Sequence, residues 1–404
     1  MDIKRLNENC SNYMRELCEN ISERTVGTAG NLEATDFFVK TISRFGWKTD
    51  LQKFKAIDWI ENGACLKAGN NSFKVFVSPY SLGFCGQSEL AVVSKITELE
   101  KGDFRNKILL LYGEIAKEQL MPKNFVFYNP ERHKRIVSLL EKSGVKAIIS
   151  ATARNSALAG GVYPFPMIED GDFNIPSVYM TEDEGERLLS QVGKKVYLKS
   201  DSQRIPSHGY NVIAKKNMNK PQKIVVTAHI DAKKNSPGAI DNATGVTILL
   251  VLAELLTDFH GDKQIEIVAF NGEDYYAVPG QMKYIEENRD NFDMICLNIN
   301  IDGAAYKYGK SSFSFFNLPE NINKVVNTEI KKYSGIVEGI QWPQGDHSIF
   351  TQMGKPAVAV SSEWFIKNID NQDITHTPKD NLKIVDYQKI IEIATAINSI
   401  IRKL

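Results

Sequence analysis

Residues 223–245, KIVVTAHIDAKKNSPGAIDNATG, decide the expected fold. The stretch begins with an apolar run of strand length, passes through polar residues and reaches the start of an apolar helix at Gly245. The same alternation continues toward the C-terminus, with the strand-like runs QIEIVAF, MICLNINI and AVAVSS and a final amphipathic helix. Strands that alternate with helices in this way predict an α/β fold.

Acidic and imidazole side chains follow each of the first three strands. They are His229 and Asp231, Glu273 and Asp274, and Asp302, with Asp241 at the start of the helix after the first strand. Open α/β sheets build their sites beyond the carboxyl ends of strands, so we expect these groups at one edge. So many carboxylates repel one another unless cations lie among them. Carboxylate and imidazole ligands without thiolate favour a catalytic site for a pair of divalent cations, zinc by ligand type.

A site of this kind needs another nitrogen ligand, and the chain has six histidines. We expect His133, in the basic run RHKR, on a helix surface and His260 at a helix end. His208 precedes a strand-like run and has no acidic neighbour. The candidates that remain are His347 in QGDHSIF and His376 in DITHTPKDNL.

The first half of the chain changes texture at about residue 57. Before that point, apolar residues at helical spacing predict two amphipathic helices, followed by the alternating strand TDLQKFK. From there to about residue 202, shorter apolar runs lie between turns, which indicates a different domain. Its expected elements are the strands 107–113, 145–150 and 175–181 and a helix from Pro130 to Lys142.

Composition excludes several classes of partner. Lysine plus arginine and aspartate plus glutamate both total 49, so a net charge of zero gives no overall attraction to nucleic acid or anionic lipid. No apolar stretch approaches the roughly 18 residues of a membrane span, and the first residues lack a signal-peptide pattern. Five scattered cysteines without a CxxC pair argue against a disulfide framework. We expect a cytoplasmic protein, or a secreted one if a signal peptide was removed; these patterns leave the oligomeric state open.

Five motifs occur in the order and approximate spacing of the M28 metallopeptidases: TAHIDAKKNSPGAIDNATG, FNGEDYYAVPGQ, NINIDG, GDHSIF and THTPKDNL. The segment ERTVGTAGNLEATDFFVKTISRFGW is similar to the start of the same catalytic domain. GVKAIIS and IPSVYMTEDEGERLL resemble parts of a protease-associated domain. The resemblance implies a zinc-exopeptidase fold, a mixed central sheet flanked by helices, formed by residues 1–56 and 203–404. A smaller, strand-rich protease-associated domain, residues 57–202, would be inserted between them.

The same resemblance assigns the metal ligands. It implies that each subunit binds two zinc ions and that Asp241 bridges them. His229 and Asp302 would complete one site, and Asp274 and His376 the other. The family also tends to hold the bridging aspartate on a non-proline cis peptide, here Asp241–Asn242.

Three further residues receive roles around the metals. Glu273 would be the general base, and Asp231 would hold the imidazole of His229 in the correct tautomer. His347 lies in a motif near the site and is a candidate for contact with substrate rather than metal. The family more often has Glu-Glu where this chain has Glu273-Asp274. The shorter arm of Asp274 puts the shape of the second metal site in question.

The activity implied by the resemblance is release of N-terminal residues from peptides. A carboxypeptidase or dipeptidase with identical ligands stays open, because end-group preference is decided in loops. A glutaminyl cyclase shares the architecture but keeps one zinc, and the intact His229-x-Asp231 pattern favours two. A non-catalytic binding module is the alternative from another class, but such relatives usually lose ligands, whereas all five ligand positions and the base carry competent side chains here.

Overall fold

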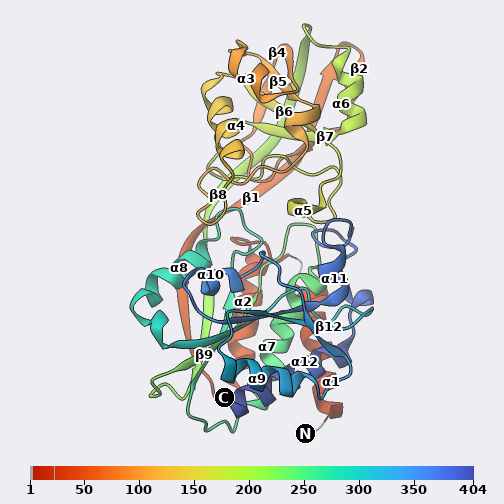
Figure 1. The fold of residues 1–404 in the computed structure, drawn as a ribbon. Coiled ribbons are helices and arrows are strands. Elements are labelled where there is room, and N and C mark those ends of the chain that lie inside the picture. Colours follow the sequence, from red (N-terminus) through yellow and green to blue (C-terminus); the bar gives the residue numbers. More distant parts are fainter. Residues whose placement is uncertain (1–2, 22) are drawn as a thin grey trace. The chain divides into compact units, whose positions relative to one another are not determined.

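A computed structural model describes residues 3–21 and 23–404, and the chain forms two compact units. The larger unit contains Met1–Ala56 and His208–Leu404, and the smaller one contains Ile57–Ser207. Strands β1 (Lys48–Ala68) and β8 (Lys195–Lys216) run from one unit into the other (Figure 1). The second boundary therefore falls within β8, at Ser207 rather than at residue 202.

The larger unit contains a mixed sheet with the strand order β13-β12-β14-β11-β9-β10-β8, and β1 pairs with β8. The strands are β9 (Lys223–His229), β10 (Gln264–Phe270), β11 (Ile295–Ile301), β12 (Ser311–Phe316), β13 (Ile336–Gly339) and β14 (Ala357–Ser362). In the centre, β10, β9, β11 and β14 are parallel, whereas β8 and β12 run antiparallel to their neighbours β10 and β14. The carboxyl ends of the four central strands therefore share one edge.

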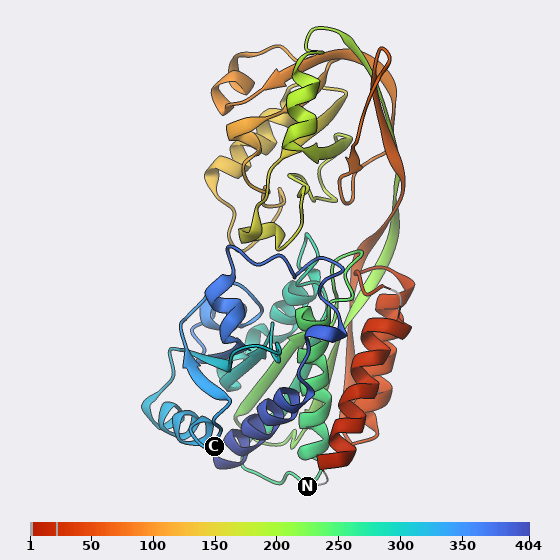
Figure 2. The ribbon, with the colours of Figure 1, turned by 90° about the vertical axis from the view of Figure 1, so that its right-hand side faces the viewer.

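Helices cover one face of this sheet and enclose the main core. They are α1 (Ile3–Arg15), the π-helical turn η1 (Glu16–Asn20), α2 (Ala29–Ser43), α7 (Thr244–Leu255), α9 (Glu320–Ile330) and α12 (Tyr387–Lys403). Alternate apolar residues of β9, β10 and β11 point into this core, as the period of two in a strand requires. Within this unit α7 packs against α1, α2 and α12, and Figure 2 shows the red, green and dark blue helices side by side.

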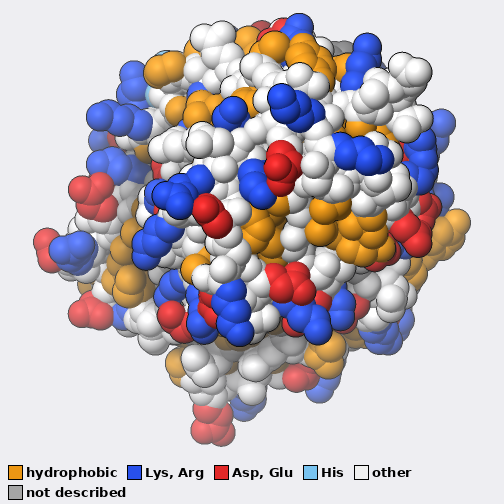
Figure 3. All heavy atoms as spheres, turned by 90° about the horizontal axis from the view of Figure 1, so that it is seen from above, with side chains coloured by type: hydrophobic (Ala, Val, Ile, Leu, Met, Phe, Trp, Pro, Cys, Tyr) orange, Lys and Arg blue, Asp and Glu red, His pale blue; other side chains and the backbone are white. Residues whose placement is uncertain are grey.

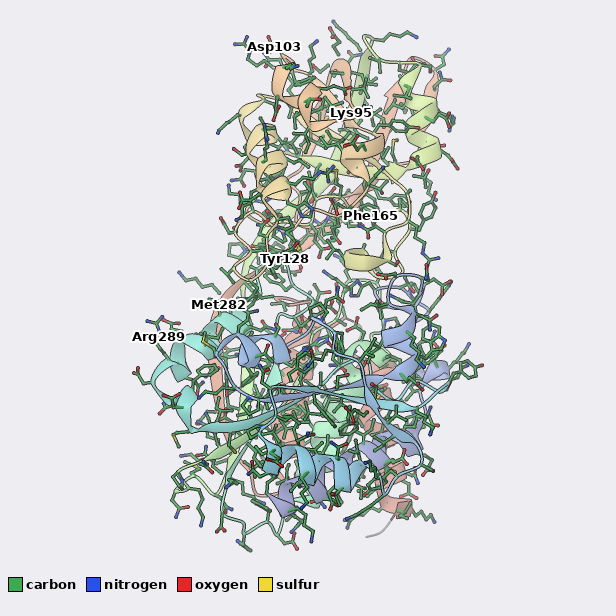
Figure 4. The ribbon with its side chains drawn as sticks, in the orientation of Figure 1. Lys95, Asp103, Tyr128, Phe165, Met282 and Arg289 are labelled. Carbon is green, nitrogen blue, oxygen red and sulfur yellow. The ribbon has the colours of Figure 1, made fainter. Side chains whose placement is uncertain are left out.

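The opposite face carries α8 (Pro279–Asn288), the short 3-10 helix η4 (Arg289–Met294) and α10 (His347–Gln352). Tyr284 of α8 is fully buried and meets Phe270 and Phe350 at ring-centroid distances of 5.2 and 5.9 Å. Met282 and Arg289, labelled in Figure 4, lie at the outer side of α8 and η4. This aromatic layer packs against the last residue of β10, directly before the turn that follows this strand.

The sequence predicted most of these strands but not all. The expected run QIEIVAF is β10, and MICLNINI and AVAVSS contain β11 and β14. Strands β12 and β13 and helix α9 were not predicted. In β12 the serines at 311, 312 and 314 are buried together with Phe313. Because polar residues lie at buried positions, the sequence of this strand is not a continuous apolar run and does not alternate between buried apolar and exposed polar residues.

The smaller unit has parallel strands β4 (Phe84–Val93), β5 (Ile108–Leu111), β6 (Ala147–Thr152) and β7 (Ser177–Thr181). Strand β3 (Phe76–Val77) pairs antiparallel with β7, and β2 (Asn71–Phe73) with β1. The helices are α3 (Ile96–Lys101), α4 (Glu131–Lys142), α5 (Ser156–Ala159) and α6 (Glu182–Leu189), with the 3-10 turn η2 (Gly113–Ala116). Phe165, labelled in Figure 4, is fully buried in the core beside α4, whereas Tyr128 is 73% exposed.

The surface agrees with the balanced composition. On the face shown in Figure 3, acidic and basic side chains are interspersed with apolar ones. In the described part of the chain, no helix combines the length and apolar character that crossing a bilayer requires.

Candidate metal centre

Neighbouring strands deliver the predicted side chains to one edge of the larger unit's sheet. His229 is the last residue of β9 and pairs in register with Phe270, the last residue of β10. Glu273 and Asp274 follow in the turn after β10, and Asp302 comes directly after β11. The expectation that groups following separate strands would meet at one edge is therefore met in the structure.

Asp241 lies at the centre of the group. It belongs to η3 (Ala239–Ala243), the short π-helical segment before α7, and its Oδ1 is 3.2 Å from His229 Nε2. Its other oxygen, Oδ2, is 3.2 Å from His376 Nε2. Asp302 Oδ1 lies 3.6 Å from the same nitrogen of His229, and Asp274 Oδ1 lies 3.1 Å from that of His376. Each oxygen of Asp241 thus faces a separate imidazole and carboxylate pair.

This geometry brings together all five predicted ligands, including Asp274 despite its short arm. The peptide bond Asp241–Asn242 is cis, as the resemblance implied. Burial alone would raise the pKa of Asp241, but the imidazoles of His229 and His376 outweigh it and hold the pKa well below its usual range.

The residues present fit divalent cations. Among the described residues, single ligand atoms of His229, Asp241 and Asp274 lie within 4.8 Å of one another. His229 Nε2 and Asp274 Oδ2 are buried and make no hydrogen bond to the described part of the protein, which is costly unless another group binds them. A donor set of imidazole nitrogens and carboxylate oxygens without thiolate suits zinc in a catalytic site.

Asp231 lies next to the imidazole of His229 and also contacts the turn after β10. Its carboxylate oxygen lies 3.6 Å from His229 Nδ1, whereas its own main-chain oxygen is closer, at 3.2 Å. The carboxylate instead accepts the backbone N–H groups of Gly272 and Asp274 at 2.9 and 3.0 Å. Asp231 therefore holds the turn that carries Glu273, and the carbonyl oxygen is the nearer acceptor for a proton on Nδ1. A proton there leaves Nε2 free to bind a cation.

Glu273 is half-buried in this turn, between two backbone positions that Asp231 fixes. Burial raises the pKa of Glu273 well above its usual range, with nearby Asp302 and Asp274 adding to the rise against the opposing effect of His229. A carboxyl group of raised pKa beside a metal-ligand cluster is suited to exchange protons.

His347 does not join the ligands in the structure. Its ring packs against Phe316 and Trp342, with centroids 4.6 and 4.8 Å away, and Nε2 donates to the main-chain oxygen of Trp342 at 3.0 Å. Burial lowers the pKa of His347 to about 4, so the ring is neutral near neutral pH. The adjacent Asp346 accepts a hydrogen bond from Gln281 at 2.8 Å, and burial raises its pKa to about 7.

Of the predictions about the remaining histidines, one was wrong. His133 was expected on a helix surface and is buried, because the segment after β5 folds over that side of α4. Its Nδ1 accepts the N–H of Met121 at 3.1 Å, and its Nε2 lies 3.2 Å from Glu118. His260 is exposed, and His208 packs against Tyr210.

Two residues that support the centre were not predicted. Arg24 is 3% exposed and donates to main-chain oxygens of the loop between His229 and Asp241, and Asp380 accepts backbone N–H groups at the end of that loop. Both lie inside quoted motifs, ERTVGTAG and THTPKDNL. Their position as ionisable residues inside these motifs is the signal that could have drawn attention to them.

Residues 211–401 match the sequence model of Peptidase family M28. This match places the larger unit in family M28. Among curated proteins, the chain is 22% identical to "Aminopeptidase YwaD" of Bacillus subtilis over 387 residues, which are 93% of this chain and 80% of that protein.

Solved structures share the fold. The aminopeptidase from Aneurinibacillus sp. strain AM-1 superposes with a TM-score of 0.76 at 21% identity, covering 98% of this chain and 93% of that one. A zinc aminopeptidase from Bacillus subtilis gives 0.73 at 19% identity, covering 98% and 94%. The glutaminyl cyclase of Porphyromonas gingivalis gives 0.53 at 15% identity, covering 98% of both chains. At these identities the likeness speaks for the M28 fold alone, which both enzyme classes share.

Proposed function

We propose that the protein is a two-zinc aminopeptidase that removes N-terminal residues from peptides. The observation that carries this proposal is the carboxylate of Asp241, whose two oxygens face His229 with Asp302 on one side and His376 with Asp274 on the other. Relatives with the printed names aminopeptidase and zinc aminopeptidase support the activity and the metal.

The chain's own residues would divide the work of hydrolysis. When bound, the zinc ions polarise the scissile carbonyl and make water more acidic. Glu273 would take one proton from the attacking water as its oxygen adds to the carbonyl carbon, and return it to the departing amine as the C–N bond breaks. Asp231 would keep Glu273 in place by holding the backbone of Gly272 and Asp274.

The rival functions differ in how much of the centre they need. A glutaminyl cyclase with one zinc leaves one imidazole and carboxylate pair without a metal. Here both imidazoles lie 3.2 Å from Asp241, and each has its own carboxylate beside it. A binding module needs neither the base nor the second pair. A carboxypeptidase or dipeptidase would use the same ligands, so the assay must separate substrates by their free terminus.

We further propose that the smaller unit, Ile57–Ser207, is a protease-associated domain without a reaction centre of its own. The cluster of metal-ligating groups found among the described residues consists of His229, Asp241 and Asp274, all in the larger unit.

The test is an assay of purified protein that is dialysed against a chelator and then given two equivalents of zinc. We expect two bound zinc ions and restored cleavage of aminoacyl arylamides, with no cleavage of N-acetylated controls. Turnover restricted to peptides with a free C-terminus would indicate a carboxypeptidase or dipeptidase. Cyclisation of N-terminal glutamine without peptide hydrolysis would indicate a cyclase, and two bound zinc ions without any turnover a binding module.

A further inference from the structure

Asp380 is a fully buried carboxylate whose hydrogen bonds go to the segment that carries Asp241. Its Oδ1 accepts the backbone N–H of Ile240 at 2.7 Å, and its Oδ2 accepts that of Asp241 itself at 3.1 Å. Its main-chain oxygen accepts the N–H of Ala239 at 3.3 Å. Three consecutive residues, 239–241, are therefore bound to one aspartate.

The other end of this connection leads to the second imidazole. Asp380 lies four positions after His376, and its own N–H donates to the main-chain oxygen of Thr377 at 3.1 Å, which closes a turn. The hydroxyl of Ser236, in the loop before Asp241, also donates to the oxygen of Thr377, at 3.2 Å. The loop that carries Asp241 and the turn that carries His376 are thus joined at several points, and Asp380 makes most of the contacts.

Arg24 secures the same loop from its other side. Its guanidinium is buried and donates to Ile230 at 3.0 Å, next to His229, and to Pro237 and Gly238 at 2.8 Å each. Gly238 has φ +58, and a Cβ there would lie 2.8 Å from the guanidinium, so the backbone passes very close to Arg24. The planar fork of arginine can reach several carbonyl oxygens at once, which the single ammonium of lysine cannot.

We propose that Asp380 is a positioning residue for the bridging carboxylate: it fixes Asp241 relative to His376 and so sets the spacing of the second metal site. The inference rests on the proposed two-zinc function. It predicts that the two metal sites respond differently. Asp380 connects the loop of Asp241 to the turn that carries His376, whereas Arg24 binds the beginning of this loop, at Ile230 next to His229, and its end, at Pro237 and Gly238. Loss of Asp380 should weaken the site of Asp274 and His376 more than the site of His229 and Asp302.

The variant Asp380→Asn tests this with little change of volume. An asparagine offers one acceptor oxygen and one NH₂ group, so one of the N–H groups of Ile240 and Asp241 must face a donor. The matched control is Asp170→Asn in the smaller unit. Asp170 is also buried and also accepts two backbone N–H groups, from Lys123 and Asp172, both at 2.7 Å. Both variants should lose stability in the metal-free state for the same reason.

Zinc affinity and stoichiometry would be measured by competition with a chromophoric chelator, together with kcat and KM and the melting temperature with and without zinc. For Asp380→Asn we expect one of the two zinc ions to bind about 10- to 100-fold more weakly, the range for groups that orient ligands. Its melting temperature should rise less on zinc addition than that of the wild type. We expect Asp170→Asn to retain two zinc ions of wild-type affinity and a wild-type kcat.

Equal zinc affinities in Asp380→Asn, Asp170→Asn and the wild type would overturn the proposal and leave Asp380 a purely structural residue. If Asp380→Asn fails to fold, Arg24→Lys becomes the deciding variant: weaker zinc binding in the folded protein supports a positioning network, and unchanged binding overturns it. A wild type that binds no zinc would instead refute the proposed function, so the two failures are distinguishable.

Discussion

Replacement of Glu273 by glutamine gives the sharpest test of the proposed chemistry. The change keeps the shape of the side chain and removes the carboxylate that would accept a proton from water. A general base contributes about 10²- to 10⁴-fold to the rate, so kcat should fall by that factor. This fall corresponds to a loss of about 2.7 to 5.4 kcal/mol of transition-state stabilisation. KM should change little, because the lost interaction is made in the transition state.

The structure explains why the metals should remain in this variant. The backbone on both sides of Glu273 is held by hydrogen bonds from Gly272 and Asp274 to the carboxylate of Asp231, at 2.9 and 3.0 Å. These bonds do not involve the side chain of Glu273. Asp274 should therefore keep its position 3.1 Å from His376 when Glu273 is replaced.

The assay compares zinc content with steady-state kinetics on an aminoacyl arylamide for the wild type and the variant. The control is Glu286→Gln, an exposed glutamate on α8 that contacts Lys283 at 3.1 Å, which should keep full activity. A decrease in kcat of less than tenfold with zinc fully bound would refute the role of Glu273 as base. Loss of zinc along with activity would show instead that Glu273 supports the metal site.

Two further predictions concern stability. Lys223→Met should lower the free energy of unfolding, measured with urea, by about 3 to 5 kcal/mol. The reason is that the buried carboxylate of Glu266, 2% exposed and 3.4 Å from the lysine, would lose its cation. A decrease below about 1 kcal/mol would contradict this prediction. His347 has a pKa of about 4 in the fold against 6.5 when unfolded, so the unfolded chain binds the extra proton and stability falls as pH decreases from 6.5 toward 4. His347→Phe should reduce the loss of stability between pH 7.5 and pH 5 by about 2 kcal/mol, whereas an unchanged pH dependence of urea unfolding would show that His347 titrates normally.

The ligand set could be predicted because its signal is local in the sequence. The three strands that lead to these ligands, β9, β10 and β11, are apolar runs of strand length, and the residues at the end of each run are placed by the strand itself. His229, Glu273 and Asp302 are therefore fixed at one edge once the strands are parallel, which βαβ patterning implies. His376 had no such anchor, and it was predicted only through the motif THTPKDNL.

The supporting contacts could not be predicted in the same way, because they depend on backbone atoms far away in the sequence. Arg24 donates to main-chain oxygens 206 to 214 positions later, and any residue supplies such an oxygen, so no partner can be recognised from its type. The hydrogen bonds of Asp231 with the N–H groups of Gly272 and Asp274, 41 and 43 positions later, could not be predicted for this reason. His133 was predicted at the surface because its neighbours in the sequence are basic. Glu118, which contacts both Arg132 and His133 in the fold, lies 14 positions before Arg132 and was not recognisable as their partner.

These contacts also show why residues before Ile57 belong to the larger unit, which carries the metal ligands. Arg24 holds the loop that contains Asp241, and Asn31 of α2 exchanges two amide hydrogen bonds with Asn271, at 2.8 and 2.9 Å, at the start of the turn that carries Glu273. Asn31 and Asn271 are both buried, so replacing one of them would leave unpaired polar groups at the start of the turn that carries Glu273. Arg24 thus supports the loop of Asp241 and Asn31 the turn of Glu273, and Asn31 also donates to the main-chain oxygen of Arg24 at 2.8 Å. The larger unit therefore needs its N-terminal part to keep Asp241 and Glu273 in fixed positions relative to each other.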